Sequence, residues 1–174
     1  FRNLPAVLVS TPLHPFDRIV QMTYQQFYDG EKPSDGRKGL NMTSWVRGSG
    51  GLGDDDRETL SGYYRNASSV FEYGLGESTA IASATKVPRY AGIDSHAEWV
   101  TYSRNASLPH FRFYFADVGD TGAWGFAKQK LPKAAFQYQL APLIAEQQAF
   151  DVYMVDGRWR LACVMAAFLH ASYH

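Results

Sequence analysis

Short apolar runs alternate with helix-like segments along the chain from residue 69 onward. Four runs are rich in the residue types that favour extended strands, at 69–74, 89–94, 111–117 and 150–156. Four other segments have the composition and spacing of helices, at 78–86, 95–104, 140–148 and 158–171. Strands that alternate with helices pack as a parallel sheet with helices on its faces. We therefore expect an α/β domain with an open parallel sheet of at least four strands.

The segment before residue 54 shows no such alternation. Its prolines and glycines recur too often for a long helix or strand, and the run 48–53 is typical of a flexible joint. We expect residues 1–53 to form an irregular N-terminal arm with aromatic anchors. Asp54, Asp55 and Asp56 then supply an N-cap and an acidic first turn for a helix that ends near Tyr64. The α/β domain is accordingly expected over residues 54–174.

Composition excludes several classes of function. The 17 Lys and Arg residues balance 17 Asp and Glu residues, so no net field favours nucleic acid as a partner. No run approaches the roughly 18 apolar residues that a membrane span needs. Cys163 is the single cysteine, which excludes an intrachain disulfide and a cysteine-rich zinc site. The five histidines show no metal-ligand spacing, so we expect no metal site.

The segment from Ser69 to Ala82 changes character halfway along. Its first half is a predicted strand, Gly74 and Gly76 permit a tight turn, and Ser78 and Thr79 begin a helix. Glycines let a ligand approach the backbone closely, and a helix N-terminus offers unpaired N–H groups. This arrangement is typical of sites that hold nucleotide-like ligands.

Acidic residues lie at or near the carboxyl end of each predicted strand: Glu72, Asp94, Asp117 and Asp156. Ligands of open parallel sheets bind outside the carboxyl ends of the strands. Asp94 also follows Gly74 by 20 residues, a spacing at which an acid accepts hydrogen bonds from ribose hydroxyls. Taken singly, such an acid is more often a turn or cap residue, but the ordered set favours a nucleoside-type site.

These motifs make residues 55–171 resemble the class I S-adenosylmethionine-dependent methyltransferases, which have a Rossmann-like fold. The resemblance rests on the segment from Glu72 to Thr79, similar to the family's acid-x-Gly-x-Gly loop, and on Val155-Asp156-Gly157-Arg158. It implies S-adenosylmethionine as cofactor and a seven-stranded sheet, usually of order 3-2-1-4-5-7-6. By resemblance, the cofactor-binding residues would be Glu72, Gly74, Gly76, Ser78, Thr79, Asp94 at the ribose and Asp117 at the adenine.

The same resemblance places Asp156 at the methyl-transfer centre. His96 follows Asp94 by two residues and is a candidate base, although a histidine at an exposed helix start explains it as well. Arg158 is a candidate for binding an anionic or sugar-like substrate. The alternative for Arg158 and Arg160 is a salt bridge to Asp151, Asp156 or Glu72.

Three residues bear on the choice between related families. A nicotinamide dinucleotide fingerprint has a third glycine where this chain has Thr79, and it does not need Glu72, so an oxidoreductase is the weaker alternative. Glu77 stands where many methyltransferases have a small residue. Its carboxylate would either contact the ammonium group of the cofactor or oppose its carboxylate.

Three of the four asparagines lie in N-x-Ser/Thr acceptor triplets, at Asn41, Asn66 and Asn105. This frequency favours a glycoprotein that passes through a secretory lumen or is extracellular, with a cytoplasmic location as the alternative. Two functions remain open. One is methyl transfer to oxygen or nitrogen of a small molecule or carbohydrate, and the other is a non-catalytic glycosylated interaction module of a larger assembly.

The segment 150–156 would be an open apolar edge in a sheet of this order. Soluble proteins rarely leave such an edge uncovered. We therefore expect a protein partner, or further residues beyond His174, to cover it.

Overall fold

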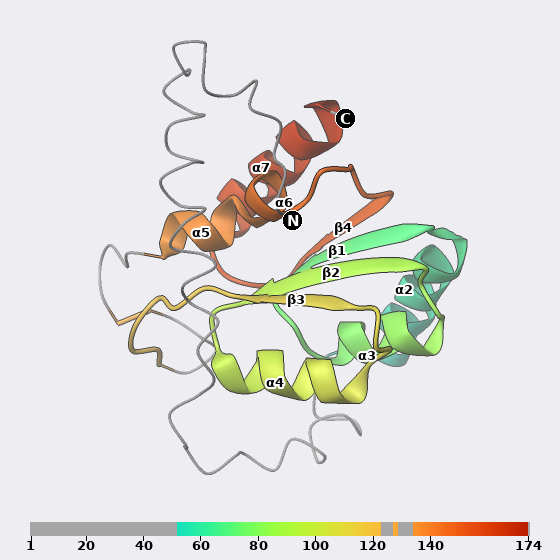
Figure 1. The fold of residues 1–174 in the computed structure, drawn as a ribbon. Helices are drawn as coiled ribbons and strands as arrows, with labels where there is room; N and C mark the ends of the chain where they lie inside the picture. Colours follow the sequence, from blue (N-terminus) through green and yellow to red (C-terminus); the bar gives the residue numbers. More distant parts are fainter. Residues whose placement is uncertain (1–51, 123–126, 129–133, 174) are drawn as a thin grey trace.

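The computed structural model describes residues 52–122, 127–128 and 134–173, so the N-terminal arm predicted for residues 1–53 lies almost wholly outside the described residues. Strands β1 (Ser69–Tyr73), β2 (Arg89–Asp94), β3 (Arg112–Phe115) and β4 (Val152–Val155) form one sheet. Its order is β3-β2-β1-β4 and every pair is parallel (Figure 1). The predicted α/β class and strand order are confirmed.

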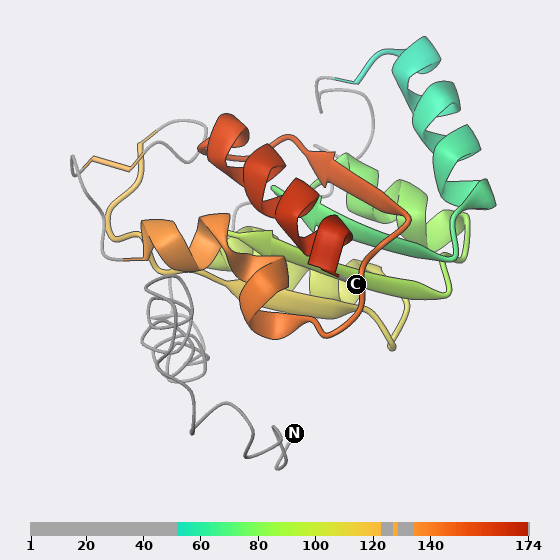
Figure 2. The same ribbon diagram turned by 90° about the horizontal axis from the view of Figure 1, so that it is seen from above.

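Helices cover both faces of the sheet (Figures 1 and 2). One face carries α2 (Asp54–Asn66), α3 (Glu77–Ala84) and α4 (Ala97–Ala106), and the other carries α5 (Ala135–Gln139), α6 (Ala141–Ala145) and α7 (Arg160–Tyr173). No helix in the described ranges is long and apolar enough to cross a membrane.

The alternation of side chains along β1 explains the two cores. Phe71 and Tyr73 point to the α5–α7 face, and Val70 points to the α2–α4 face, where Tyr90 of β2 joins it. All five residues of β1 are buried, because β1 lies between β2 and β4 and is covered on both faces. Glu72 follows Val70 by two residues and therefore enters the α2–α4 face as a buried acid.

The helix predicted at 140–148 is wrong in its bounds. The structure has two short helices that meet at Leu140, and α5 occupies residues that were expected to be loop. Pro142 lies in the first turn of α6, where its missing N–H costs no intrahelical hydrogen bond. The other predicted elements are present, with ends that differ by a few residues.

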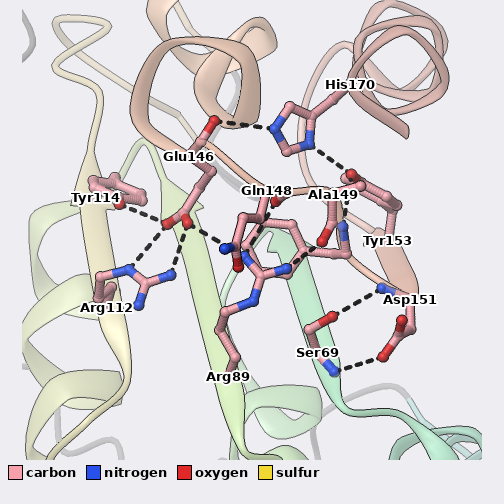
Figure 3. Close-up of polar contacts among 11 residues, drawn as sticks. Ser69, Arg89, Arg112, Tyr114, Glu146, Gln148, Ala149, Asp151, Tyr153 and His170 are labelled. Atoms are coloured by element: carbon pink, nitrogen blue, oxygen red, sulfur yellow. Dashed lines mark hydrogen bonds and ion pairs between the residues drawn. The ribbon is translucent and has the colours of Figure 1, made fainter. Parts of the chain in front are cut away.

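The amino edge of the sheet, where the strands begin, is held by buried polar contacts (Figure 3). Arg112 binds the carboxylate of Glu146 through Nε at 3.0 Å and Nη2 at 2.7 Å, and the Tyr114 hydroxyl donates to the same carboxylate at 2.8 Å. Arg89 lies 3.7 Å from it and stacks over the Phe150 ring. We call Arg89, Arg112, Tyr114 and Glu146 the amino-edge cluster.

His170 fastens α7 to this edge. It is fully buried, its Nε2 lies 3.1 Å from the carbonyl of Glu146, and its Nδ1 lies 2.6 Å from the Tyr153 hydroxyl (Figure 3). Asp151 accepts the N–H groups of Ser68 and Ser69, which joins β4 to β1. The amino edge is thus occupied by structural contacts, and space for a ligand has to be sought at the carboxyl edge.

Candidate functional site

Gly74 ends β1 in a backbone conformation that favours glycine. Its φ is +88°, and a Cβ at this position would lie 2.7 Å from the Cα of Gly157. The loops after β1 and β4 therefore touch, with the Asp156 N–H donating to the Tyr73 carbonyl at 3.0 Å. The close packing of these two loops therefore requires a glycine at position 74.

Gly76 is different, because no described atom crowds it. Its φ of 174° is extended, and a Cβ would meet no atom of the described residues within 4 Å. Gly76 is the N-cap of α3, so its open side lies beside amide groups that have no partner within the helix. We call residues 74–78 the glycine loop, and its open side at Gly76 is the first feature of a ligand cradle.

Asp94 is the last residue of β2, and its carboxylate forms a hydrogen bond with the glycine loop. Its Oδ2 accepts the Leu75 N–H at 2.8 Å, and its Oδ1 accepts the His96 N–H at 2.8 Å. Burial, the largest cause, raises the pKa of Asp94 from 3.8 to about 6, although hydrogen bonds from the backbone of Leu75, His96 and Ser95 lower it. A carboxylate has about four acceptor positions, so some acceptor capacity remains beyond these amides.

Glu72, Ser78 and Thr79, around the start of α3, are buried. Glu72 is fully buried, and its Oε2 accepts hydrogen bonds from the hydroxyls of Thr79, at 2.7 Å, and Tyr90. Thr79 is 2% exposed and Ser78 7% exposed. These three predicted residues therefore support the loop from inside the α2–α4 face.

Asp117 and His96 lie where the sequence predicts them, at the carboxyl ends of β3 and β2. Asp117 is exposed, and its Oδ1 accepts the Gly119 N–H at 2.9 Å, which leaves its other oxygen facing solvent. His96 is the N-cap of α4. Its Nδ1 is buried and makes no hydrogen bond within the described part of the chain, so it can serve a ligand.

The turn between β4 and α7 holds the predicted catalytic residues Asp156 and Arg158. The exposed Asp156 carboxylate pairs with Arg160 at 2.6 Å, which confirms for Arg160 the alternative of a salt bridge. The Arg158 N–H donates to the Tyr138 hydroxyl at 3.3 Å. Trp159 has φ of +50°, unusual for a residue with a side chain, and its ring packs edge-on against Tyr138.

Glu77 has a partner that the sequence did not reveal. Arg57 of α2 donates to its carboxylate at 2.5 Å from Nε. The departure from the family pattern at Glu77 therefore joins α2 to the start of α3. Arg57, Tyr90 and Tyr138 each contact a residue of another helix or strand, and the sequence analysis did not identify them. Only the position of Tyr90 could be predicted from the sequence, because strand alternation places it on the same face as Val70 and Glu72.

Among the residues that the structure describes, no group of three or more His, Cys, Asp or Glu is placed to hold a metal ion. Of the described acids near the carboxyl edge, Asp94 and Asp117 accept backbone amides, Asp156 pairs with arginine, and Glu72 accepts hydroxyl groups.

Comparisons with known proteins give one informative likeness. No protein-family model and no curated protein matches the chain. Among solved structures, the chain is similar to a methyltransferase-like protein from Silicibacter pomeroyi, with a TM-score of 0.57 and 24% sequence identity. The match covers 67% of this chain and 65% of that protein. Together with the parallel sheet, it shows that the chain has a methyltransferase-like, Rossmann-like fold.

Proposed function

We propose that the chain binds S-adenosylmethionine at the carboxyl edge and transfers its methyl group to oxygen or nitrogen of a small molecule or carbohydrate. The observation that carries this proposal is Gly76, whose open side lies at the N-terminus of α3 and faces no atom of the residues that the structure describes. The methyltransferase-like fold supports the same choice of ligand.

The residues present fit this cofactor. The α3 N-terminus suits a carboxylate such as that of the methionine moiety. Asp94 keeps acceptor capacity for ribose hydroxyls, and the exposed oxygen of Asp117 suits the amino group of adenine. Bound S-adenosylmethionine would supply an electrophilic methyl group.

The chain's own contribution to the reaction is orientation and proton removal. His96 has an Nδ1 that no described residue occupies, so it can take a proton from the nucleophile. The Asp156 carboxylate is fixed by Arg160 and can accept a hydrogen bond from the acceptor substrate. Arg158, on the same turn, would bind an anionic or sugar-like group. Holding the nucleophile in line supplies most of the rate.

Substitution of Gly76, with Gly74 for comparison, tests the ligand cradle. Gly76→Val should lower affinity for S-adenosylmethionine and S-adenosylhomocysteine at least about tenfold, because its side chain fills the open side. Its melting temperature should fall only modestly, because a Cβ there meets no described atom and the cost comes from a poorer N-cap. Gly74→Ala should lower the melting temperature more, because its Cβ would lie 2.7 Å from the Gly157 Cα. Calorimetry that finds no binding of either compound by the wild-type chain would remove the proposal, and binding of a nicotinamide dinucleotide would favour the oxidoreductase alternative.

An interaction module is the second candidate function, and a specific surface favours it. Four exposed apolar side chains follow one another at helical spacing along α7: Leu161, Val164, Met165 and Phe168. In the described sheet β4 is an edge strand. We propose that a protein partner or a further segment of chain covers this edge. Leu161→Ser with Phe168→Ser should reduce association in sedimentation velocity, whereas Tyr63→Ser, an exposed site on α2, should not.

We also propose that Asn66 and Asn105 carry glycans and that the protein enters a secretory lumen. Both asparagines are exposed and lie near the amino edge, at the ends of α2 and α4, so glycans there leave the carboxyl edge clear. Asn41 lies outside the described residues. The intact mass of protein secreted from a eukaryotic host, compared with that of Asn66→Gln and Asn105→Gln, tests this proposal.

A further inference from the structure

Glu72 is a fully buried carboxyl group surrounded by hydroxyl groups from three other elements. Thr79 and Ser78 of α3 and Tyr90 of β2 all hydrogen-bond to it. Tyr64 of α2 is also fully buried, and Glu72 contributes to raising the pKa of its hydroxyl, so the two groups are close. We call Glu72 with these four residues the Glu72 cluster.

Two atoms of this cluster lack hydrogen-bond partners. Glu72 Oε1 and the Tyr64 hydroxyl oxygen are both buried, and neither makes a hydrogen bond in the described part of the structure. An unmade hydrogen bond inside a protein is costly. A hydrogen bond between these two atoms would remove both deficits, either with the Tyr64 hydroxyl donating to an ionised Oε1 or with a protonated Oε1 donating to Tyr64. Only the second arrangement leaves the buried carboxyl group uncharged.

No described cation neutralises this carboxyl group. The titratable groups that act on it are Tyr64, Tyr90 and Asp156, and the Asp156 carboxylate opposes its ionisation. Arg57 is committed to Glu77 and Asp54. Burial, the largest cause, raises the pKa of Glu72 from 4.5 to about 7, while the hydroxyls of Ser78, Tyr90 and Thr79 lower it.

The cluster is connected to the ligand cradle by a short chain of hydrogen bonds. The Gly76 N–H donates to the Thr79 hydroxyl oxygen at 3.1 Å, and the Thr79 hydroxyl donates to Glu72 Oε2 at 2.7 Å. Two hydrogen bonds therefore connect the Glu72 carboxyl group to Gly76, the residue at the open side of the ligand cradle.

We propose that Glu72 is a positioning residue, and that the proton it shares with the surrounding hydroxyls sets the placement of Gly76 and so tunes ligand affinity. The link to ligand affinity rests on the proposed function, but the proton itself does not. Glu72 acts through Thr79 and makes no contact with the ligand. Protonation of Glu72 weakens its hydrogen bond with the Thr79 hydroxyl, and ionisation strengthens that hydrogen bond.

Titration of the Glu72 carboxyl carbon by ¹³C NMR, on the ligand-free full chain, tests the proton directly. The expected midpoint lies near pH 7. Tyr90→Phe should shift it upward, because the Tyr90 hydroxyl stabilises the ionised form. Asp55→Asn, which removes an exposed acid on α2, should leave it unchanged. A midpoint below pH 5 in the wild type would overturn the proposal.

Affinity for S-adenosylhomocysteine, measured between pH 6 and 8, tests the coupling. In the wild type, this affinity should change with pH, and the midpoint of the change should match the midpoint found for Glu72. The change should be absent in Glu72→Gln, whose side chain is neutral at every pH and close in shape to that of glutamate. A pH-dependent affinity that persists in Glu72→Gln would overturn the coupling. If S-adenosylhomocysteine fails to bind at any pH while Glu72 still titrates near neutrality, the proposed function fails and the positioning role moves to whichever ligand does bind beside Gly76.

Discussion

At the scale of single residues, two glycines of the candidate site differ in how closely other atoms surround them: Gly157 is tightly packed and Gly76 is not. A Cβ on Gly157 would overlap the Tyr138 hydroxyl oxygen and lie 3.0 Å from the Gly74 nitrogen. Gly76 has open space at the same point. The residue type is the same, but Gly157 is constrained by packing and Gly76 is left open.

Gly157→Ala should therefore destabilise the fold by about 1–3 kcal/mol, the usual cost of overpacking. Chemical denaturation of the variant measures the loss. Tyr138→Phe removes the hydroxyl that the new methyl group would strike, so the double variant should recover part of the loss. A double variant no more stable than Gly157→Ala would show that Tyr138 is not the obstacle.

Asp94 gives a pH dependence with a definite sign. Its pKa is higher in the folded protein, at about 6, than the ordinary 3.8, so the folded state binds the proton more tightly. Its contribution to stability is fully present below pH 3.8 and is lost as pH rises through 6. The shift corresponds to a change on the order of 3 kcal/mol.

Denaturation of Asp94→Asn at several pH values measures this contribution. The variant should be less stable, because one amide oxygen cannot serve both the Leu75 and the His96 N–H groups. Its deficit relative to the wild type should shrink between pH 4 and pH 6.5. A deficit that grows over this interval would contradict the raised pKa.

The sequence could predict the residues whose role is local. Gly74 and Asp94 follow from strand ends and from the spacing along the chain. Arg57, Tyr138 and the depth of Glu72 could not be predicted, because each depends on which side chain from a distant element reaches the same point. Glu77 illustrates the limit, since its partner Arg57 lies 20 residues earlier on another helix.

At the scale of elements, the two edges of the sheet are held by different means. The amino-edge cluster joins β2 and β3 to the segment after α6, and His170 adds α7 through its contact with the Glu146 carbonyl. The carboxyl edge is closed by glycine contacts and backbone hydrogen bonds. We therefore expect ion pairs to contribute more to stability at the amino edge, and close backbone packing to contribute more at the carboxyl edge.

Removing Glu146 tests this division. Glu146→Ala should cost roughly 1–3 kcal/mol, because the partly exposed Arg112 and the Tyr114 hydroxyl would both lose their partner. Arg160→Ala breaks a pair whose side chains are both more than half exposed, so it should cost less than about 1 kcal/mol. Denaturant midpoints compare the two. Equal losses of stability in the two variants would mean that burial does not determine how much each ion pair contributes.

Element bounds show where sequence patterns lose information. The strands were predicted because their apolar runs are continuous and end at turn residues. The predicted helix at 140–148 failed because its apolar residues suit either one helix or two short ones. The break at Leu140 is decided by tertiary contacts, including the bond from the Tyr73 hydroxyl to the Gln139 carbonyl at 2.9 Å.

At the scale of the whole molecule, the order β3-β2-β1-β4 puts the glycine loop near the centre of the carboxyl edge and Asp94, Asp117 and Asp156 on strands around it. The sequence could predict this arrangement, since it follows from parallel strands with acids at the same ends. It could not show which acids face a ligand. The structure gives Asp94 and Glu72 inward contacts and leaves Asp117 and Asp156 exposed.

A ligand at the carboxyl edge should therefore leave a one-sided signature across the sheet. Saturating S-adenosylhomocysteine, at about 100 times its Kd, should stabilise the fold by about 2.7 kcal/mol. Hydrogen exchange should slow most at residues 74–79 and 94–96, where the backbone amides surround Gly76 and Asp94. Exchange at Glu146 and Asp151 should slow only as far as the global gain in stability requires, because the amino edge is already filled by its own contacts. Selective protection at the amino edge would instead place the ligand among Arg89, Arg112 and Glu146, and the function would have to be sought there.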